Sequence, residues 1–579
     1  MIAVMIDGCC LLGDIAETED MSNQEERERL LQLEWREKVI PNLGGSQWIR
    51  VYQPGRTGLP EQVGFFCGLI PNANVQASLK TYKWDIYIGE GVPGFMQSYD
   101  ETGNRQTLYD QYGHLKHKIE PLVIVRSFHG LRPDTIEIVE EFRFFHNLFL
   151  DDDNTTYVQH DESGDLVRVA RVSDNTVDIR RKHIRQFLAA KRMSLVIYFE
   201  RMCFSVLTLK QLSILEAAVD VKNGECAYQF STINRDWWVH RDEKSQSWIL
   251  GKKIIEGLPL EKCGLWPFDD ENTRKYEEFI IGVDSDDELV LYTSDPEQLG
   301  NYFGKNPDAP QYVTPVYFKR GVLNRYYSEP SKYEVKDGYL SCQGLWGIRI
   351  DTSQPNYVIA LLGDLGRDLP KKEQAHWKHN NVVPDGPLSR TAFKRWYLGE
   401  FAEPEDSAIV FQQTFMRFQD AWQNKQGWHL FLPLSEPDSH HFKTLRRPIT
   451  QELSELDEIV LSLSKLLVDS INIKKLKYLI LDFQTKDERG TDKRSIKILI
   501  EYLQMSGIDR AEDLSSCLRS VQELRSASAA HRKGGKYDKV AKRYGLDSAG
   551  TQWIADDIFS AITEFLINLG KHFLLDVSN

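Results

Sequence analysis

The sequence predicts an α+β N-terminal region, mixed and rich in strands, followed by an all-α helical bundle at the C-terminus. Short apolar runs separated by turn residues recur from about residue 46 to residue 363, and such runs are typical of strands. Beyond about residue 445 the apolar residues instead recur every three or four positions, which is the period of an amphipathic helix. A chain of 579 residues is long enough for several domains of ordinary size.

The first apolar runs predict an α+β domain over residues 21–220. Two helices are expected among its strands, at residues 135–147 and 181–191, because their apolar residues follow a helical spacing. The strands are expected at residues 48–52, 63–66, 122–125, 166–169 and 195–199. Residues 1–20 end in an acidic segment and precede Met21, a second plausible start. We therefore expect them to be a flexible extension or the product of a start codon assigned too far upstream.

Residues 221–430 are expected to form a second, mixed α/β region. Its clearest strands are residues 279–283, 316–318 and 357–361. The segment 284–308 is acidic and contains several glycine, proline and asparagine residues, so we expect an exposed loop there. From residue 370 to residue 424 the pattern becomes helical.

The C-terminal region, residues 445–579, is expected to be a helical bundle. Its first helix carries an apolar stripe made of Leu453, Leu456, Val460, Leu463 and Leu467. Further helices are expected at residues 493–505, 511–530 and 551–574. Several amphipathic helices joined by short connections are typical of an antiparallel bundle.

The composition limits the classes of protein to be considered. The formal net charge is −14, so any contact with nucleic acid requires a local basic patch on an acidic chain. The eight cysteines include no Cys-x-x-Cys pair, which argues against a zinc ribbon or a disulfide scaffold and is consistent with a reducing compartment. No apolar run approaches the roughly 18 residues that a membrane-spanning helix needs. We therefore expect a cytoplasmic protein that does not contact membranes.

The residues that indicate chemistry lie near the end of the helix expected at 511–530. Arg525 and His531 are six residues apart, just before a Gly-Gly pair, and most residues between them are small. Small side chains allow a ligand or a partner helix to approach the backbone. A basic cluster follows at once and is the best candidate for a phosphate-binding patch on this acidic chain. Its members are Arg532, Lys533, Lys536, Lys539, Lys542 and Arg543.

An arginine and a histidine can together cleave RNA without a metal ion. The RNA carries its own nucleophile, the 2′-hydroxyl, and an imidazole can take its proton or protonate the leaving 5′-oxygen. A guanidinium can bind two phosphoryl oxygens and stabilise the charge that develops in the transition state. No P-loop is present, and no cofactor or metal is expected.

An arginine followed, after four to six residues, by a histidine in a C-terminal helical bundle resembles the HEPN family. More specifically, the region from about residue 427 onward resembles ApeA-like HEPN proteins of bacterial anti-phage and toxin systems. Members of the family often have asparagine, aspartate or histidine directly after the arginine, whereas this chain has Ser526. The resemblance covers only about the last quarter of the chain.

The resemblance implies an endoribonuclease effector that acts in abortive infection. It implies catalytic roles for Arg525 and His531. Beside this pair, Ser526 or Ser528 could add a hydrogen bond to phosphate, and Arg532, Lys533, Lys536 and Lys539 are expected to contact the RNA. HEPN nucleases dimerise, so a homodimer through the bundle is implied, with two Arg/His pairs in one cleft. The substrate would be RNA, tRNA included, and the N-terminal region would sense a phage-derived trigger or restrain the nuclease.

Other interpretations remain open. The bundle could be a non-catalytic HEPN module that dimerises or binds nucleic acid or a nucleotide, or an enzyme site could lie in the N-terminal half. Three further patterns have simpler structural explanations. They are the Arg235/His240 pair, which has a similar spacing in a strand-like context, the glycine-rich segment 89–94, and the His376/His379 pair, which could ligate a metal from one helical face.

Overall fold

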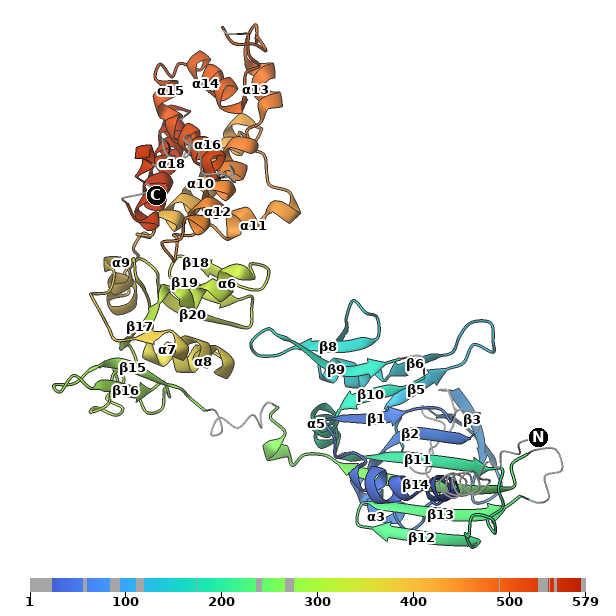
Figure 1. Cartoon of the computed structure of the whole chain (residues 1–579). Coiled ribbons are helices and arrows are strands. Elements are labelled where there is room, and N and C mark those ends of the chain that lie inside the picture. The colour runs from blue at the N-terminus through green and yellow to red at the C-terminus, as the bar shows by residue number, and fades with distance from the viewer. Residues whose placement is uncertain are drawn as a thin grey trace, which may run out of the picture. The chain divides into compact units, whose positions relative to one another are not determined.

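The computed structural model describes most of the chain as two compact units (Figure 1). The first unit consists of Met1–Asp161 and Asp165–Arg274, and the second of Glu162–Gly164 and Lys275–Asn579. The described residues are 23–55, 60–83, 94–110, 119–173, 175–235, 242–265, 275–488, 490–528, 540, 542–545 and 549–573. Strands dominate up to about residue 370 and helices follow, which confirms the general layout that the sequence predicts. The expected extension at residues 1–20 lies outside the described residues.

One of the two five-stranded sheets of the first unit is antiparallel, in the order β12-β13-β14-β11-β2. The central strand β11 (Met193–Ser205) pairs with β14 (Ser245–Glu256) on one side and with β2 (Glu61–Pro71) on the other. β13 (Cys226–Asn234) and β12 (Ala217–Asn223) complete the sheet beyond β14. β11 is buried along nearly its whole length, as its unbroken apolar run predicts for a strand covered on both faces.

This sheet crosses the domain boundary expected at residue 220, so that boundary is wrong. Residue 220 lies inside β12, whose backbone pairs with β13 along its whole length. β12 is a largely exposed edge strand, so no long apolar run marks it in the sequence.

The second sheet of the first unit is antiparallel, in the order β1-β10-β9-β8-β7. The helix α5 (Arg181–Lys191) follows β10 directly and buries Ile184, Phe187 and Leu188 in the same core as β1, β2 and β11. The expected helix at 181–191 is confirmed. The strands are β1 (Trp48–Tyr52), β10 (Val177–Arg180), β9 (Leu166–Val172), β8 (Thr156–His160) and β7 (Phe149–Leu150).

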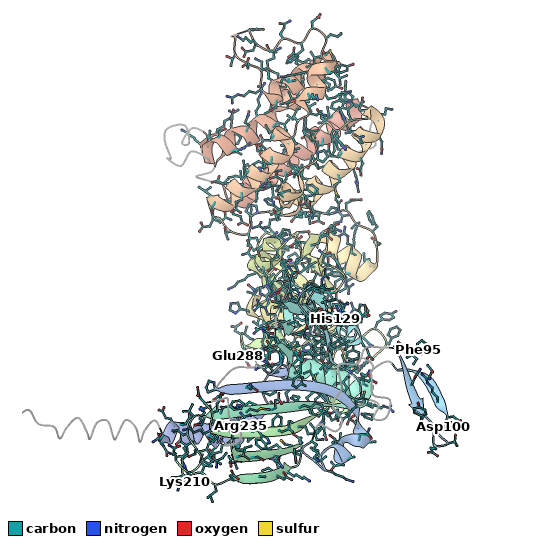
Figure 2. The ribbon with its side chains drawn as sticks, turned by 90° about the vertical axis from the view of Figure 1, so that its right-hand side faces the viewer. Phe95, Asp100, His129, Lys210, Arg235 and Glu288 are labelled. Atoms are coloured by element: carbon teal, nitrogen blue, oxygen red, sulfur yellow. The ribbon has the colours of Figure 1, made fainter. Side chains whose placement is uncertain are left out.

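The helix expected at residues 135–147 is only partly present. Its first part is a strand, β6 (Thr135–Ile138), which pairs with β5 (Val123–Arg126), and only α4 (Glu140–Phe145) is helical. The β-branched residues of β6 favour an extended backbone, and pairing with β5 stabilises this segment as a strand. Another hairpin, β3 (Gly94–Tyr99) with β4 (Arg105–Asp110), extends away from the sheets of this unit, as the labelled Phe95 and Asp100 show in Figure 2.

The first unit is expected to lose stability as the pH falls from about 6.5 to about 4. Burial lowers the pKa of His146 to about 4 and that of His183 to about 3, and the charged rings would also repel each other. In the unfolded chain a histidine titrates near its ordinary pKa of about 6.5. Between these values the unfolded state binds more protons, so the free energy of unfolding falls with falling pH, by up to about 1.4 kcal/mol per unit for each histidine.

Urea unfolding between pH 4 and pH 7 measures this slope. A His146→Gln/His183→Gln variant should show a shallower dependence on pH, whereas substitution of the exposed His129 should leave the slope unchanged. Equal slopes in all three proteins would contradict the assignment.

The second unit begins with a small β-rich part. Six strands form a sheet in the order β18-β19-β20-β21-β17-β22, and β15 (Glu278–Val283) pairs with β16 (Leu289–Thr293) in a separate hairpin. The loop expected at 284–308 therefore contains one strand that its acidic composition does not indicate. Phe318, Tyr326 and Trp377 are in the core of this part. The strands are β18 (Glu334–Lys336), β19 (Tyr339–Cys342), β20 (Trp346–Asp351), β21 (Tyr357–Leu361), β17 (Pro315–Lys319) and β22 (Asn381–Val382), and the helices are α6 (Asn324–Ser328), α7 (Leu362–Asp368), α8 (Lys371–His379) and α9 (Arg390–Phe393).

The helical bundle starts at α10 (Ser407–Gln426), so the boundaries expected at residues 430 and 445 are too late. Phe411, Phe418 and Trp422 of α10 are fully buried in one core with the helices that follow. Figure 1 shows these helices grouped together. They are α11 (His440–Lys443), α12 (Leu453–Ser464), α13 (Ile473–Leu479), α14 (Ser495–Met505), α15 (Ala511–Leu514), α16 (Ser516–Ser528) and α18 (Thr551–His572).

The expected apolar stripe is confirmed from Leu456 to Leu467 as a buried face, whereas Leu453 at its start is only half-buried. A π-helical turn, η8 (Lys465–Asp469), continues α12 and carries the last residue of the stripe, Leu467. The helix expected at 511–530 is divided into α15 and α16 by Ser515. Among the described residues, no helix has the length and the apolar character required to cross a membrane.

Polar contacts join the β-rich part of the second unit to the bundle. Asp406 caps α10 by accepting hydrogen bonds from the backbone N–H groups of Ala408 and Ile409, and one of its oxygens lies 3.9 Å from Arg320. Both charged groups are almost completely buried. Arg447 pairs with Asp556 of α18 and also donates to the carbonyl of Ser353 at 3.3 Å.

Candidate functional site

Arg525 lies in the last turn of α16 and contacts the neighbouring end of α12. Its Nη1 donates hydrogen bonds to the Oγ atom of Ser464 at 2.9 Å and to the carboxylate of Asp469 at 2.7 and 2.9 Å. Ser464 is the last residue of α12 and is fully buried, and Asp469 ends η8. Two residues from one helical segment therefore hold a single guanidinium nitrogen.

The Arg525–Asp469 ion pair lies at the surface. The Arg525 side chain is 36% exposed and the Asp469 side chain 45% exposed. An exposed pair of this kind contributes at most about 1 kcal/mol, because water screens the charges. A phosphate group can therefore compete with Asp469 for the guanidinium at small energetic cost.

Ser526 follows Arg525 and uses its hydroxyl within its own helix. The Oγ atom donates a hydrogen bond to the carbonyl of Gln522 at 2.8 Å, which is the usual backward bond of a serine in a helix. In this arrangement the hydroxyl oxygen can still accept a hydrogen bond from a ligand, but its proton is already donated to the carbonyl of Gln522. A hydrogen bond from Ser526 to phosphate would require its side chain to rotate.

The remaining predicted site residues lie outside the described part of the chain. These are His531, Arg532, Lys533, Lys536 and Lys539. The structure places Arg525 and Ser526 at the end of α16, and the sequence places His531 three residues beyond that helix.

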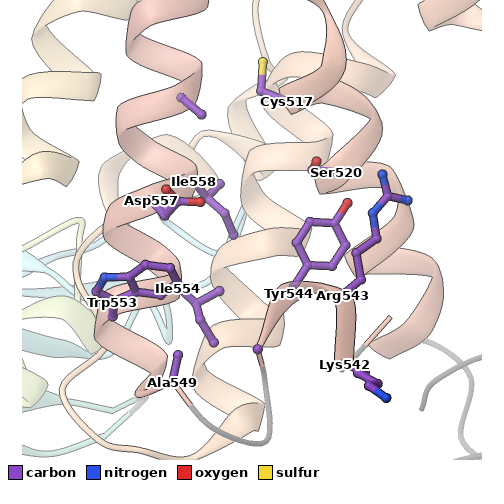
Figure 3. A pocket seen from close by; sticks show the side chains of 12 residues that line it. Cys517, Ser520, Lys542, Arg543, Tyr544, Ala549, Trp553, Ile554, Asp557 and Ile558 are labelled. Carbon is purple, nitrogen blue, oxygen red and sulfur yellow. The ribbon is translucent and has the colours of Figure 1, made fainter. Parts of the chain in front are cut away.

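A pocket of about 400 Å³ lies on another part of α16, between this helix, residues 542–545 and α18 (Figure 3). Trp553 and Asp557 of α18 line it, together with Lys542, Arg543 and Tyr544. The apolar side chains of α18 and Cys517 also contribute to its lining. Burial raises the pKa of the Cys517 thiol to about 12, so this cysteine is not an activated nucleophile.

Glu523 of α16 holds the short 542–545 segment in place. Its carboxylate accepts a hydrogen bond from Arg543 at 3.0 Å and another from the hydroxyl of Tyr544 at 3.2 Å. Burial, with a smaller contribution from the Glu523 charge, raises the pKa of Tyr544, so its hydroxyl remains protonated and can keep donating. The wall of the pocket opposite α18 is therefore anchored without a ligand.

Sequence reasoning did not single out Asp469, Ser464, Trp553 or Asp557. Trp553 had a detectable signal, because it directly precedes Ile554 of the apolar stripe and so falls on the outer face of the expected helix. No sequence signal indicated Asp469, because its contact with Arg525 joins residues that are 56 positions apart.

The candidate metal ligands show no metal-binding geometry in the described residues. No group of three or more histidine, cysteine, aspartate or glutamate side chains that could hold a metal ion occurs there. His376 instead has its Nε2 atom 2.9 Å from the carbonyl oxygen of Val322. The Arg235/His240 pair and the glycine-rich segment 89–94 fall largely outside the described residues.

Comparison with known proteins identifies no relative for this chain. No family model, no curated protein and no solved structure matches it.

Proposed function

We propose that the C-terminal bundle is a metal-independent endoribonuclease of the HEPN type. The observation that carries the proposal is an oriented, partly exposed guanidinium, Arg525, at the end of α16 and six residues before His531 in the sequence. A cation held in place at the surface can stabilise developing phosphoryl charge without reorganising during the reaction.

The proposed chemistry divides the work between two side chains. Arg525 binds non-bridging phosphoryl oxygens, and His531 transfers the proton of the attacking 2′-hydroxyl or of the leaving 5′-oxygen. One histidine cannot easily perform both proton transfers at once, so a homodimer that brings two Arg/His pairs to one cleft is part of the proposal. The basic residues Arg532, Lys533, Lys536 and Lys539 would bind the RNA backbone.

The proposed biological role is the degradation of RNA, tRNA included, during abortive infection by phage. The regions before the bundle would then sense a phage-derived trigger. The buried pair of Arg320 with Asp406, and Arg447, which contacts both the Ser353 carbonyl and Asp556, offer a physical connection from the β-rich part of the second unit to α10 and α18.

Product analysis tests the proposed reaction. Purified full-length protein is incubated with total RNA and with tRNA in EDTA, and the fragment ends are determined. Fragments with 2′,3′-cyclic phosphate and 5′-hydroxyl ends are expected, since attack by the 2′-hydroxyl forms the first and releases the second. Cleavage that stops in EDTA, or fragments with 5′-phosphate ends, would contradict the proposal.

Removing the charge of Asp469 is expected to improve RNA binding. In Asp469→Asn the side chain still accepts a hydrogen bond from Arg525 but no longer competes with phosphate through its charge. We expect the KM for RNA to fall about two- to fivefold with little change in kcat, because an exposed pair contributes only about 0.2–1 kcal/mol. Glu512→Gln alters the ion pair of Arg519, which lies on α16 as Arg525 does, and should change neither KM nor kcat. A higher KM in Asp469→Asn would instead show that the carboxylate is needed to position Arg525.

A non-catalytic bundle is the second candidate, and the same contacts favour it. Arg525 joins α16 to the end of α12, so the residue also has a purely structural use. Arg525→Lys separates the two functions, because lysine can keep an ion pair with Asp469 but cannot reproduce a two-pronged contact with phosphate. Cellular activity that survives both Arg525→Lys and His531→Ala would favour the non-catalytic bundle.

A further inference from the structure

The pocket between α16 and α18 is lined by aromatic side chains and by charged side chains of both signs. Its volume of about 400 Å³ is within the range of about 300–1,000 Å³ that is typical of small-molecule sites. Figure 3 shows Trp553 on the α18 side and Tyr544 with Arg543 on the other side. An aromatic wall, cationic groups and one carboxylate thus surround the same space.

Trp553 provides a surface for an aromatic ligand. Its side chain is 62% exposed, although tryptophan is the largest apolar residue and its neighbour Ile554 is buried. Stacking of a nucleobase on such a ring is favourable for every base, because each has a π-face. The ring therefore indicates a planar heterocycle rather than an aliphatic ligand.

Lys542 and Arg543 provide positive charge at the other side of the pocket. Both are exposed, and Arg543 is paired with Glu523 at 3.0 Å. No ion pair of Lys542 occurs among the described residues. Its ammonium group is therefore the better candidate for a phosphate contact.

Asp557 provides an acceptor that distinguishes between bases. It lies one helical turn after Trp553 on α18 and lines the same pocket. A carboxylate accepts hydrogen bonds but donates none, and its two oxygens match two adjacent N–H donors. Guanine presents such a pair in N1–H and the 2-amino group, whereas adenine presents an acceptor, N1, beside its amino group. The carboxylate therefore favours guanine.

We propose that this pocket binds a guanine nucleotide, with the base stacked on Trp553 and hydrogen-bonded to Asp557 and the phosphate at Lys542. The nucleotide is either free or part of a single-stranded RNA, since both present the same base and phosphate. Binding here does not require cleavage at Arg525, whose Nη1 contacts a different pair of elements, α12 and η8.

Isothermal titration of the full chain with GMP, AMP, guanosine and inorganic phosphate tests the proposal. GMP is expected to bind about tenfold more tightly than AMP, because a good two-bond contact discriminates by about 1–3 kcal/mol. Trp553→Ala is expected to weaken GMP binding about tenfold or more through the loss of stacking. Lys542→Ala should weaken GMP binding but not guanosine binding, and Asp557→Asn should remove the preference for GMP over AMP.

Two matched substitutions control for general effects. Tyr478→Ala removes an aromatic side chain that is 81% exposed elsewhere in the bundle, and Lys571→Ala removes an exposed charge near the end of α18. Neither should change GMP binding. Circular dichroism checks that the exposed substitutions leave the fold intact.

A second pair of ligands distinguishes the source of the nucleotide. Two short 2′-O-methyl RNAs, which lack the attacking hydroxyl, are compared. One contains a single guanine in a uracil run, and the other contains uracil alone. Tighter binding of the guanine-containing strand than of GMP indicates an RNA subsite, and tighter binding of GMP indicates a free nucleotide; both results support the pocket. Absence of GMP and RNA binding at millimolar concentration, equal binding of GMP and AMP, or binding that Trp553→Ala does not change would overturn the proposal.

Discussion

Arg525→Ala is expected to lower the rate of RNA cleavage by about 100- to 1,000-fold, the usual effect of removing one group that stabilises transition-state charge. The side chain lies at the surface, so its loss should affect the reaction far more than the fold. His531→Ala is expected to have an effect of about 100-fold or more, because it removes the group proposed to transfer protons. Single-turnover cleavage of a defined RNA in EDTA measures both effects.

Arg519→Ala is the matched control for Arg525→Ala. Arg519 is also on α16, its side chain is 45% exposed, and it pairs with Glu512 at 3.2 Å. Its substitution should leave the cleavage rate within about twofold, because an exposed pair contributes little. If Arg525→Ala and Arg519→Ala cleave at the same rate as the wild type, Arg525 is not a catalytic residue.

The second large effect is expected at Asp406. Asp406→Ala removes both the cap of α10 and the negative charge nearest to the buried guanidinium of Arg320. Burial raises the pKa of Asp406, against the effect of Arg320. Removing one partner of a buried pair leaves the other charge uncompensated, so we expect a loss of about 3–5 kcal/mol in the free energy of unfolding.

Urea unfolding of the full chain, with hydrogen exchange read at α10, measures this loss in the second unit. Asp406→Asn should lose less, because asparagine can still cap the helix. Asp513→Ala breaks an exposed pair with Arg510 at 2.8 Å and should change the free energy by no more than about 0.5 kcal/mol. A loss below about 1 kcal/mol in Asp406→Ala would show that water reaches Arg320 once the carboxylate is gone.

Regular elements with a clear period were predictable. The strand β1, the helix α5 and the strand β21 have the bounds that the apolar spacing indicates. The apolar stripe of α12 also faces the core as expected. Local side-chain spacing is sufficient in these cases because each element buries one continuous apolar surface.

Domain boundaries were not predictable, because they depend on which partner an element packs against. β12 has no long apolar run and was not recognised as an edge strand, although β13 pairs with all of it. α10 has ordinary helical spacing, but only its contacts with the later helices show that it belongs to the bundle. Backbone pairing and packing between distant segments leave little trace in the local sequence.

The sequence by itself determined the layout of strands followed by helices, the apolar faces of the longest helices and the hypothesis of an Arg525/His531 pair. Only the tertiary structure decided which groups surround Arg525, because the contact with Asp469 and Ser464 arises where α16 packs beside the end of α12. It also decided that Lys542 lines one pocket with Trp553 and Asp557, since α18 and the 542–545 segment meet only through packing. Periodicity reports which side of an element is buried, whereas a site depends on three-dimensional contacts between elements that the sequence does not encode locally.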